Sequence, residues 1–498
     1  MNPHASTKYA GRLLMALAAI SSILLMAACG SGVTIVPAKG GFGNGSLSGS
    51  YAYTLKGYGF NNSLGTSADF FVEGGVFTAD GKGNITAGTD DFVAGGIQPI
   101  LATPITGTYS INKDGTGSLQ FNTAGAPLEV FAITLSDSGD LYMEEADGGG
   151  TSAGSAHLQT STTTPSGTFV FRTHDVQTSA TMGTMSISAG AVSGSYLMVQ
   201  NGVANTGSIG AGGTMTAPTG GRGTITYSVN GLTHQAEYYV VSSSKFLLLD
   251  TTANILSIGL AEQQSNVTFS AASLSGSYAF GSSGETTTRG FVNTVGAFTT
   301  DGVSKVTAAN YDSVQDGTVS SNQTATGTYL IDNSVGNGSG SVTVAGLTAD
   351  IWMVSPKRAY FVALNGTNVE DGTIDQQSGT FTNTSLSAQA AFFMDGFDAT
   401  GVDGLFKDRV GTLVPGGTNS LGTNYVTSFF DYIALAGGSS SNTFSGTYSV
   451  ASNGRTTTQL NGFTNNIVLY LTTNSTGYLL QADAGVNMSG AFTAQPTQ

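Results

Sequence analysis

The chain repeats itself four times from residue 46 onward, and this repetition limits the possible folds more than any other feature. Residues 46–51, with the sequence Ser-Leu-Ser-Gly-Ser-Tyr, recur at 273–278, and weaker copies begin at Ser166 and Ser385. The corresponding positions lie 118, 109 and 112 residues apart, at Gly49, Gly167, Gly276 and Ala388. Repetition at this spacing predicts a tandem array of similar structural units.

Two further marks recur in the same order within the repeats. Gly-Thr-Tyr lies in the middle of three repeats, at 107–109, 327–329 and 446–448, whereas the second repeat has Gly-Thr-Met at 213–215. A glutamine closes each unit, at Gln159, Gln263, Gln376 and Gln495. The marks divide the chain into β repeats at 46–163, 164–269, 270–382 and 383–498.

Each repeat of about 110 residues is expected to contain eight short strands. In the first repeat these are expected near 50–57, 69–78, 84–92, 103–111, 117–122, 128–135, 140–145 and 153–159. Hairpin signals such as Asp80-Gly81 separate them, and no helical periodicity follows residue 28. Sequential strands joined by short turns favour a small eight-stranded up-and-down barrel for each repeat. A β-sandwich of the immunoglobulin type is the alternative within this all-β class.

Charged residues are scarce, and acidic ones predominate. They make up 9% of the chain, against roughly 25% in typical soluble proteins, and the formal net charge is −15. Because the sequence has no basic patch, we expect it to bind neither nucleic acid nor, by electrostatics, anionic lipid. Apolar residues make up 40%, which is enough for folded cores surrounded by a surface of Ser, Thr, Asn and Gly. The single cysteine excludes an intramolecular disulfide.

The first 28 residues have the features of a secretory signal peptide. Residues 1–12 contain Lys8 and Arg12 and no acid, and residues 13–28 are apolar and end in small side chains. This apolar stretch is shorter than the ~20 residues that a membrane-spanning helix requires. Membrane attachment is therefore expected to be covalent.

Residues 26–30, Met-Ala-Ala-Cys-Gly, resemble the lipobox of bacterial lipoproteins. The resemblance implies cleavage before Cys29, a thioether-linked lipid on Cys29 and acylation of the new N-terminus. Two or more acyl chains give stable anchoring, and residues 29–45 would then be the lipidated cysteine and a flexible tether. Residue 30 is not Asp, which in the enteric sorting rule favours the outer membrane. We therefore expect a lipid-anchored cell-envelope protein, periplasmic or surface-facing.

The repeats also resemble units of uncharacterised envelope lipoproteins of bacteria. Their strand rhythm and Gly-Thr-Tyr mark are loosely similar to lipocalin-like and avidin-like barrels. Neither resemblance assigns a binding residue.

Two Asp-Gly loops are candidate calcium sites, because hard cations bind clustered oxygens. They are Asp80-Gly81 and Asp301-Gly302. Neither loop offers the six to eight oxygen ligands of a full site, and the second repeat has no acid at the equivalent segment. The same dipeptides are typical of hairpin turns, and we favour that interpretation.

Several acidic residues lie next to one another in the sequence. Carboxylate pairs hydrolyse glycosides when they are held at a defined separation, but adjacent residues on a strand point to opposite faces. We therefore expect these acids to lie at solvated strand ends. They are Asp90, Asp91, Glu144, Glu145, Asp147, Glu370 and Asp371.

The histidines expected in the mature chain, His157, His174 and His234, are spread over two repeats and do not predict a zinc site. The one Gly-x-Ser-x-Gly match, at 150–154, is not followed by a helical pattern and so does not predict a nucleophile elbow, and the sequence contains no phosphate loop. We expect no enzyme activity, no metal and no cofactor. Trp352, the only tryptophan, is expected in a barrel core at a position shared with Phe131.

The leading functional hypothesis is a non-catalytic envelope protein that acts as a surface spacer or as an adhesion or binding module. The alternative is a small-ligand carrier with a cavity inside one or more barrels. Packed barrel interiors would argue against the carrier.

Overall fold

The computed structural model shows four closed eight-stranded barrels, one after another in the chain. It describes residues 41–496 apart from 61–65, 124–125, 137–138, 177–178, 287–289, 335, 346, 365–367, 401–404, 417–418 and 461–466. The prediction of an all-β chain of four up-and-down barrels is confirmed, and the β-sandwich alternative is wrong.

The first barrel consists of β1 (Ser48–Phe60), β2 (Ala68–Asp80), β3 (Asn84–Ala94), β4 (Ile100–Ile111), β5 (Thr116–Thr123), β6 (Ala126–Leu135), β7 (Leu141–Glu145) and β8 (Gly150–Leu158). The second consists of β9 (Gly167–Asp175), β10 (Ser179–Ser188), β11 (Ala191–Gln200), β12 (Val203–Met215), β13 (Arg222–Val229), β14 (Leu232–Ser242), β15 (Lys245–Asp250) and β16 (Ser257–Gln263).

The third barrel consists of β17 (Ser275–Thr286), β18 (Phe291–Asp301), β19 (Lys305–Gln315), β20 (Thr318–Ile331), β21 (Ser339–Val344), β22 (Leu347–Ser355), β23 (Arg358–Ala363) and β24 (Asn368–Gln376). The fourth consists of β25 (Ala390–Asp398), β26 (Leu405–Gly416), β27 (Ser420–Asp431), β28 (Ala436–Val450), β29 (Arg455–Leu460), β30 (Ile467–Thr473), β31 (Thr476–Gln481) and β32 (Val486–Ala494).

Each barrel closes because its first strand pairs with both the second and the eighth. In the first barrel, β1 pairs with β2 along its whole length and with β8 from Tyr51↔Leu158 to Gly59↔Gly150. All these pairs are antiparallel. A closed cylinder has no unpaired edge strand, so a barrel does not need a neighbour to complete its hydrogen bonds.

Side chains alternate along each strand, and the inward-pointing ones fill the barrel. On β1, Tyr51, Tyr53 and Leu55 point inward and are almost completely buried. Tyr51 stacks on Phe77 of β2 with ring centroids 5.2 Å apart. Similar clusters of aromatic and aliphatic side chains fill the other three barrels. Burying one such side chain contributes about 1.5–3 kcal/mol, so each barrel has a substantial core of its own.

The Gly-Thr-Tyr mark closes one end of three barrels. In the first, the Tyr109 hydroxyl donates to the main-chain oxygen of Leu47 at 2.7 Å, just after the short 3-10 helix η1 (Asn44–Ser46). The equivalents are Tyr329 with η2 (Ala271–Ser273) and Tyr448 with η3 (Asn383–Ser385). The tyrosine thus holds the segment before the first strand in place over the end of the barrel. The second barrel has Met215 at this position.

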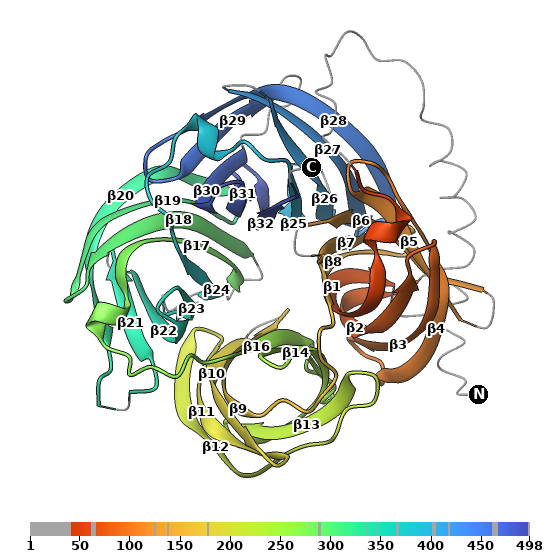
Figure 1. Ribbon diagram of the computed structural model, residues 1–498, viewed down its shortest axis with the longest axis horizontal. Coiled ribbons are helices and arrows are strands. Elements are labelled where there is room, and N and C mark those ends of the chain that lie inside the picture. Colours follow the sequence, from red (N-terminus) through yellow and green to blue (C-terminus); the bar gives the residue numbers. More distant parts are fainter. Residues whose placement is uncertain are drawn as a thin grey trace.

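The four barrels form a ring in which each lies beside the next and the fourth lies beside the first (Figure 1). Apolar side chains on the outer faces pack at the junctions. Between the first two barrels, Val72 and Val93 pack with Leu247 and Leu249. Further apolar clusters join the second barrel to the third, the third to the fourth and the fourth to the first. Many strands are therefore buried on both faces.

A glutamine fastens each barrel to the next. Nε2 of Gln377, just after β24, donates to the main-chain oxygen of Leu471 in the fourth barrel at 2.7 Å. Nε2 of Gln495 donates to the oxygen of Leu135 in the first barrel at 2.6 Å, which closes the ring. The equivalent contacts are Gln159 to Val240 and Gln264 to Met353.

In two repeats, the glutamine that makes this contact is one residue later than the glutamine predicted from the sequence. The residues equivalent to Gln159 and Gln495 are Gln264 and Gln377 rather than the preceding Gln263 and Gln376. Each donates its main-chain N–H back to the first strand of its own barrel, as Gln377 does to Ser277 at 2.8 Å. Two adjacent glutamines in both repeats made the sequence register ambiguous.

Candidate functional site

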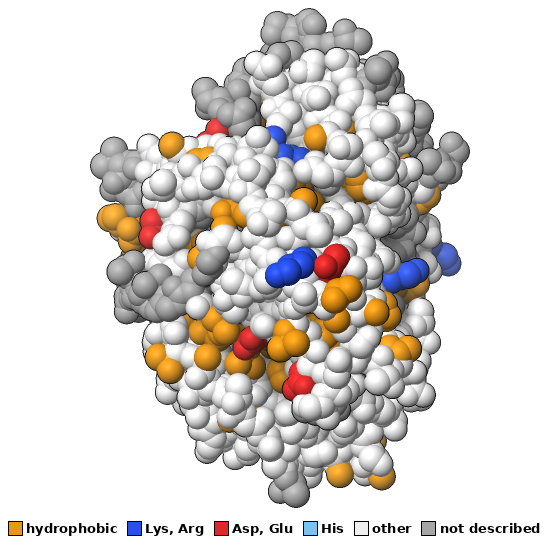
Figure 2. Space-filling view, turned by 90° about the vertical axis from the view of Figure 1, so that its left-hand side faces the viewer, with side chains coloured by type: hydrophobic (Ala, Val, Ile, Leu, Met, Phe, Trp, Pro, Cys, Tyr) orange, Lys and Arg blue, Asp and Glu red, His pale blue; other side chains and the backbone are white. Residues whose placement is uncertain are grey.

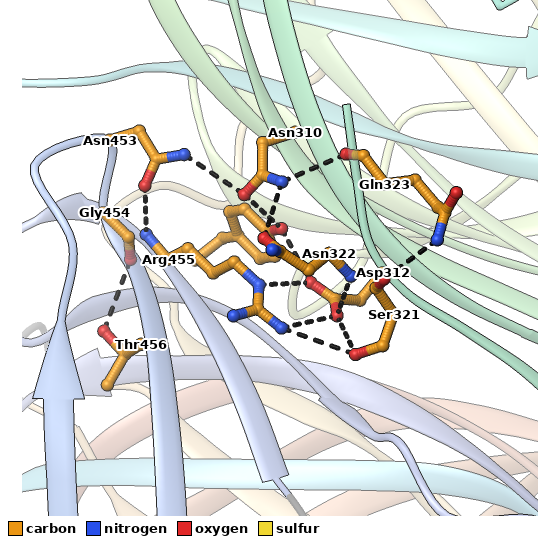
Figure 3. A network of polar contacts seen from close by, with 10 residues as sticks. Asn310, Asp312, Ser321, Asn322, Gln323, Asn453, Gly454, Arg455 and Thr456 are labelled. Atoms are coloured by element: carbon orange, nitrogen blue, oxygen red, sulfur yellow. Dashed lines mark hydrogen bonds and ion pairs between the residues drawn. The ribbon is translucent and has the colours of Figure 1, made fainter. Parts of the chain in front are cut away.

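The junction of the third and fourth barrels contains a network of polar side chains (Figure 3). Arg455, the first residue of β29, donates from Nε and Nη2 to the two carboxylate oxygens of Asp312 on β19, both at 2.7 Å. The Tyr470 hydroxyl on β30 donates to the same carboxylate at 2.7 Å. Nδ2 of Asn453 donates to Oδ1 of Asn310 at 3.2 Å. Side chains of the fourth barrel thus converge on one strand of the third.

Asp312 is completely buried, and its carboxylate accepts hydrogen bonds from several donors. It also accepts the Ser321 hydroxyl at 2.7 Å and the main-chain N–H of Asn322 at 2.8 Å. Asn322 has φ of +55°, so Asp312 stabilises an unusual backbone conformation in β20. Burial alone would raise the pKa of Asp312, but hydrogen bonds from Arg455, Ser321 and Tyr470 lower it below its ordinary value.

The same triad recurs at the junction of the first and second barrels. Nε and Nη2 of Arg222 donate to the two oxygens of Asp91 at 2.7 Å, and the Tyr239 hydroxyl donates to that carboxylate at 2.8 Å. Arg222 also lies 3.2 Å from Glu237. Burial and the neighbouring Asp91 charge raise the pKa of Glu237 to about 7, against the influence of Arg222.

The other two junctions have uncharged residues at the equivalent positions. A shared hydrogen bond aligns the barrels: the N–H of Leu135, Val240, Met353 and Leu471 donates to Gly115, Gly221, Gly338 and Gly454, respectively. By this register the second–third junction has Leu197, Ser339 and Trp352 in place of Asp, Arg and Tyr. The fourth–first junction has Val426, Thr116 and Thr134. The three triad positions are therefore Asp, Arg and Tyr at two junctions and uncharged at the other two, in alternation around the ring.

A groove of about 950 Å³ lies next to the triad of the third–fourth junction. Its walls are the outer faces of β18, β19 and β20, the linker 377–380 and the turn between β28 and β29. Among the residues that line it, Arg455 is the one with a charge, and Asp312 already pairs with it. Most lining side chains are hydroxyls or amides: Ser277, Thr299, Thr307, Asn310, Asn322, Thr324, Thr326, Gln377, Thr380, Ser452 and Asn453.

Several ion pairs of the described chain connect neighbouring barrels. They include Arg222–Asp91, Arg455–Asp312, Arg172–Asp371, Arg358–Glu262 and Lys56–Asp395. The outer surface is correspondingly poor in charge. Figure 2 shows a face made mostly of neutral polar groups and backbone, with a few scattered charged side chains.

The two Asp-Gly loops are turns held by their own aspartate. Oδ1 of Asp80 accepts the main-chain N–H groups of Lys82 and Asn84 at 2.7 and 3.0 Å. Oδ1 of Asp301 accepts three N–H groups of its turn, including that of Lys305 at 2.9 Å. The hydrogen bonds from Asn84 and Lys82 lower the pKa of Asp80 to about 2.

The expectation that the adjacent acids lie at solvated strand ends is wrong, because all seven are buried. Asp90 points into the first barrel, where it accepts the Tyr53 hydroxyl at 3.1 Å, while Asp91 points outward to Arg222. In the third barrel, Glu370 points inward and accepts the Ser282 hydroxyl at 2.5 Å. Residues adjacent in the sequence do point to opposite faces of the strand, but packing between barrels buries the outer face as well.

Outward-pointing members of these pairs meet the next barrel. Asp371 accepts Nη1 of Arg172 and Nδ1 of His174 from the second barrel, both at 2.6 Å. Burial would raise the pKa of Asp371, but His174 and Arg172 lower it to about 2. Glu144 faces the fourth barrel, and burial together with the Asp408 charge raises its pKa well above the ordinary value.

Each of the three histidines in the described chain pairs with one aspartate. His157 lies 2.7 Å from Asp140, and His174 and His234 make the same Nδ1 contact with Asp371 and Asp250. Among the described residues, no three His, Cys, Asp or Glu side chains are grouped so that they could hold a metal ion.

Trp352 is buried, but not in a barrel core, and its counterpart is not Phe131. It lies on the outer face of β22, 8% exposed, and packs against Leu197 and Val199 of the second barrel. Phe131 points into the first barrel. The register places Thr134 at the position equivalent to Trp352, so the similarity of two apolar runs misaligned them by three residues.

Cys29, the leader 1–28 and most of the tether lie outside the described residues. In the described part of the chain, no helix is long and apolar enough to cross a membrane. Sequence reasoning missed the Asp–Arg–Tyr triads. The signal was present as Arg222 and Arg455, which lie at corresponding places in the second and fourth repeats.

Comparison with protein-family models gives no match for this chain. Comparison with curated proteins also gives none.

Proposed function

We propose that this protein is a non-catalytic binding module of the cell envelope, anchored to the outer membrane by lipid on Cys29. The leader and lipobox support the anchor. The ring supports a rigid displayed body, because hydrogen bonds and apolar contacts connect all four barrels. The neutral polar surface suits a molecule that works among hydrated polymers and carries few charges to attract ions or nucleic acid.

The observation that carries the binding role is the groove between the third and fourth barrels. Its volume of about 950 Å³ lies near the upper end of the roughly 300–1,000 Å³ typical of ligand sites. Hydroxyl and amide groups both donate and accept hydrogen bonds. We therefore assign the groove to a neutral, hydroxyl-rich ligand, namely an oligosaccharide segment of an envelope or extracellular polymer.

The alternative of a small-ligand carrier has less support. Aromatic and aliphatic side chains fill the described interior of each barrel, such as Phe121 and Phe131 in the first. Arg455, the one charged residue that lines the groove, is already paired with Asp312, which also favours binding over catalysis.

The anchor is tested by Cys29→Ser in the full chain. We expect the variant to lose labelling by a clickable fatty acid and to remain uncleaved by the lipoprotein peptidase. Acyl labelling that persists in the variant would show that the anchor lies elsewhere.

The binding role is tested by titrating the mature protein with maltohexaose, cellohexaose and xylohexaose. Thr324→Trp places a large side chain in the groove and should weaken binding at least tenfold. Thr328→Trp is the matched control, because Thr328 is exposed on the same strand but outside the groove. Equal binding by both variants would move the ligand elsewhere, and the absence of binding by all three sugars would contradict the assignment.

A further inference from the structure

A second, smaller pocket lies where all four barrels meet. Its volume is about 60 Å³, and every barrel contributes to its lining. Lys56, His174 and Asp395 occupy the same position of the first strand in the first, second and fourth barrels, seven residues after Gly49, Gly167 and Ala388. These side chains point away from their own barrels, so the pocket exists only in the assembled ring.

Aromatic rings form one wall of this pocket, which we call the axial pocket. Tyr58 of the first barrel stacks on Phe406 of the fourth, with ring centroids 4.3 Å apart and planes 12° from parallel. Phe70 meets both rings edge-on at 5.0 and 5.3 Å. Phe291 of the third barrel lies edge-on to Phe406 at 6.1 Å.

Three carboxylates also line the axial pocket, and they differ in their partners. Asp395 pairs with Lys56 at 2.8 Å, and Asp408 accepts the Thr151 hydroxyl at 2.5 Å. Glu285 lines the pocket and makes neither a hydrogen bond nor an ion pair with a described residue. The basic side chains nearby already have partners, since His174 contacts Asp371 and Lys56 contacts Asp395.

Glu285 is partly buried, and a carboxylate with little access to water is unfavourable when ionised and is stabilised by a proton or by a cation. Burial raises the pKa of Glu285 to about 7, so it is available to exchange a proton for a cation near neutral pH. Burial and the Asp395 charge raise the pKa of Asp408 as well.

We propose that the axial pocket binds the ammonium end of a small alkylamine, with Glu285 and Asp408 as its anionic partners and the Tyr58–Phe406 wall as its aromatic partner. Aromatic faces attract organic cations, whereas hard metal ions require a cage of oxygen ligands. A volume of about 60 Å³ holds roughly two water molecules, at about 30 Å³ each. It therefore admits a primary ammonium with its first methylene, and not a quaternary head group.

The experiment uses the mature full chain and measures binding of cadaverine by isothermal titration calorimetry at pH 8. We expect Glu285→Gln and Asp408→Asn each to weaken binding at least tenfold. Glu237→Gln is the matched control, because Glu237 is also buried with a raised pKa but lies at the first–second junction. It should leave the affinity within twofold.

Three further probes decide between ligand classes. Tetramethylammonium should bind at least tenfold more weakly than cadaverine, since it is too large. Nα-acetyl-lysine methylamide tests whether the amine can belong to a peptide, and binding equal to that of cadaverine would extend the site to lysine side chains. Calcium binding that is sensitive to Glu285→Gln, or no loss of cadaverine affinity in that variant, would overturn the proposal.

Discussion

Asp91 and Asp312 show how a chain with few charges uses them. Each carboxylate is completely buried and accepts hydrogen bonds from an arginine and a tyrosine of the next barrel. A buried ion pair adds little net stability compared with an apolar contact. Removing one partner, however, leaves the other charge buried and unpaired. We infer that these residues specify which barrel faces pack against each other.

Arg455→Met should lower the free energy of unfolding by about 3 kcal/mol, because it leaves Asp312 buried without a cation. Urea denaturation followed by Trp352 fluorescence measures the change in the third barrel. Lys305→Met is the control: Lys305 is exposed on the same strand as Asp312, and its loss should change stability by less than about 0.5 kcal/mol. Equal effects would mean that the ion pair is not required at the junction.

The junctions that lack the Asp–Arg–Tyr triad predict a rescue of that loss. Asp312→Leu, Arg455→Ser and Tyr470→Trp together install the residues found between the second and third barrels, Leu197, Ser339 and Trp352. Because apolar replacement of a buried ion pair is often neutral, the triple variant should regain most of the stability lost in Arg455→Met. Circular dichroism during urea denaturation measures this. A triple variant as unstable as the single one would show that the two kinds of junction are not interchangeable.

Glu285 should make stability depend on pH between about 4.5 and 7. Its pKa is raised by burial from 4.5 to about 7 in the folded state, while His174 and Lys56 oppose the shift and Asp175 adds to it. The folded protein then holds the proton more tightly than the unfolded chain, so stability falls as pH rises through this window. Glu285→Gln, which mimics the protonated form, should match the wild type at pH 4 and exceed it at pH 8.

Glu262→Gln is the control of opposite sign. Burial would raise the pKa of Glu262, but Arg358 and Lys245 lower it below its ordinary value. This variant should lose stability at pH 8. If the wild type is more stable than Glu285→Gln at pH 8, the Glu285 carboxylate has a partner in solution.

At the scale of the strand, the Gly-Thr-Tyr mark combines two requirements. Its tyrosine closes the barrel end, and its glycine allows the next strand to approach. A Cβ on Gly327 would lie well inside van der Waals contact of the main-chain oxygen of Thr343, and the same holds for Gly107 and Gly446 with their neighbours. Glycine therefore recurs because the paired backbone leaves no room for a side chain.

Gly327→Ala should lower the stability of the third barrel by about 1–3 kcal/mol, because the methyl group must displace a paired strand. Gly210→Ala is the control, since a Cβ there would meet nothing within 4 Å and the residue is exposed. Thermal denaturation compares the two. A stable Gly327→Ala protein would show that the strands can shift without loss.

The closing glutamine acts at the scale of one junction. Gln495 is buried, and its Nε2 donates to the oxygens of both Leu135 and Asp114. Gln495→Ala leaves those carbonyl oxygens without this donor, at a cost of about 1–3 kcal/mol. Hydrogen exchange should accelerate in β6 and β32, while Gln323→Ala, an exposed glutamine, should leave those rates unchanged. Unchanged exchange in Gln495→Ala would mean that the other fourth–first contacts alone hold the ring closed.

At the scale of the whole molecule, the barrels and the ring are stabilised by side chains on opposite faces of the same strands. Inward side chains hold each barrel together, and outward ones hold the ring. A single barrel is therefore expected to fold alone while exposing apolar junction surface that the ring covers. This differs from a solenoid, in which each repeat needs its neighbours to complete its core.

Trp352 reports directly on this division. In a fragment of residues 270–382, the third barrel should keep a β-type circular dichroism spectrum, but Trp352 should emit at longer wavelength than in the full chain, because its partners Leu197 and Val199 are missing. A fragment of residues 164–382 restores them and should recover the blue-shifted emission. Blue-shifted emission from the single barrel would place Trp352 in its interior, against the structure. A single barrel without β structure would show that the junctions are needed for folding.

The sequence by itself determined the repeating unit and its fold. Strand rhythm, turn dipeptides and the Gly-Thr-Tyr mark are local signals, and up-and-down pairing joins strands that are neighbours in the chain. Alternation along a strand also correctly separated Asp90 from Asp91.

Only the tertiary structure decided where the outward faces go. The triad partners Asp312 and Arg455 are 143 residues apart, and Gln495 meets Leu135 across 360 residues. No local pattern distinguishes an outward acid that meets water from one that meets the arginine of another barrel. The seven buried acids, the position of Trp352, the groove and the axial pocket all follow from ring packing. That packing depends on the shapes and charges of complete barrel surfaces, which exist only after the barrels have folded.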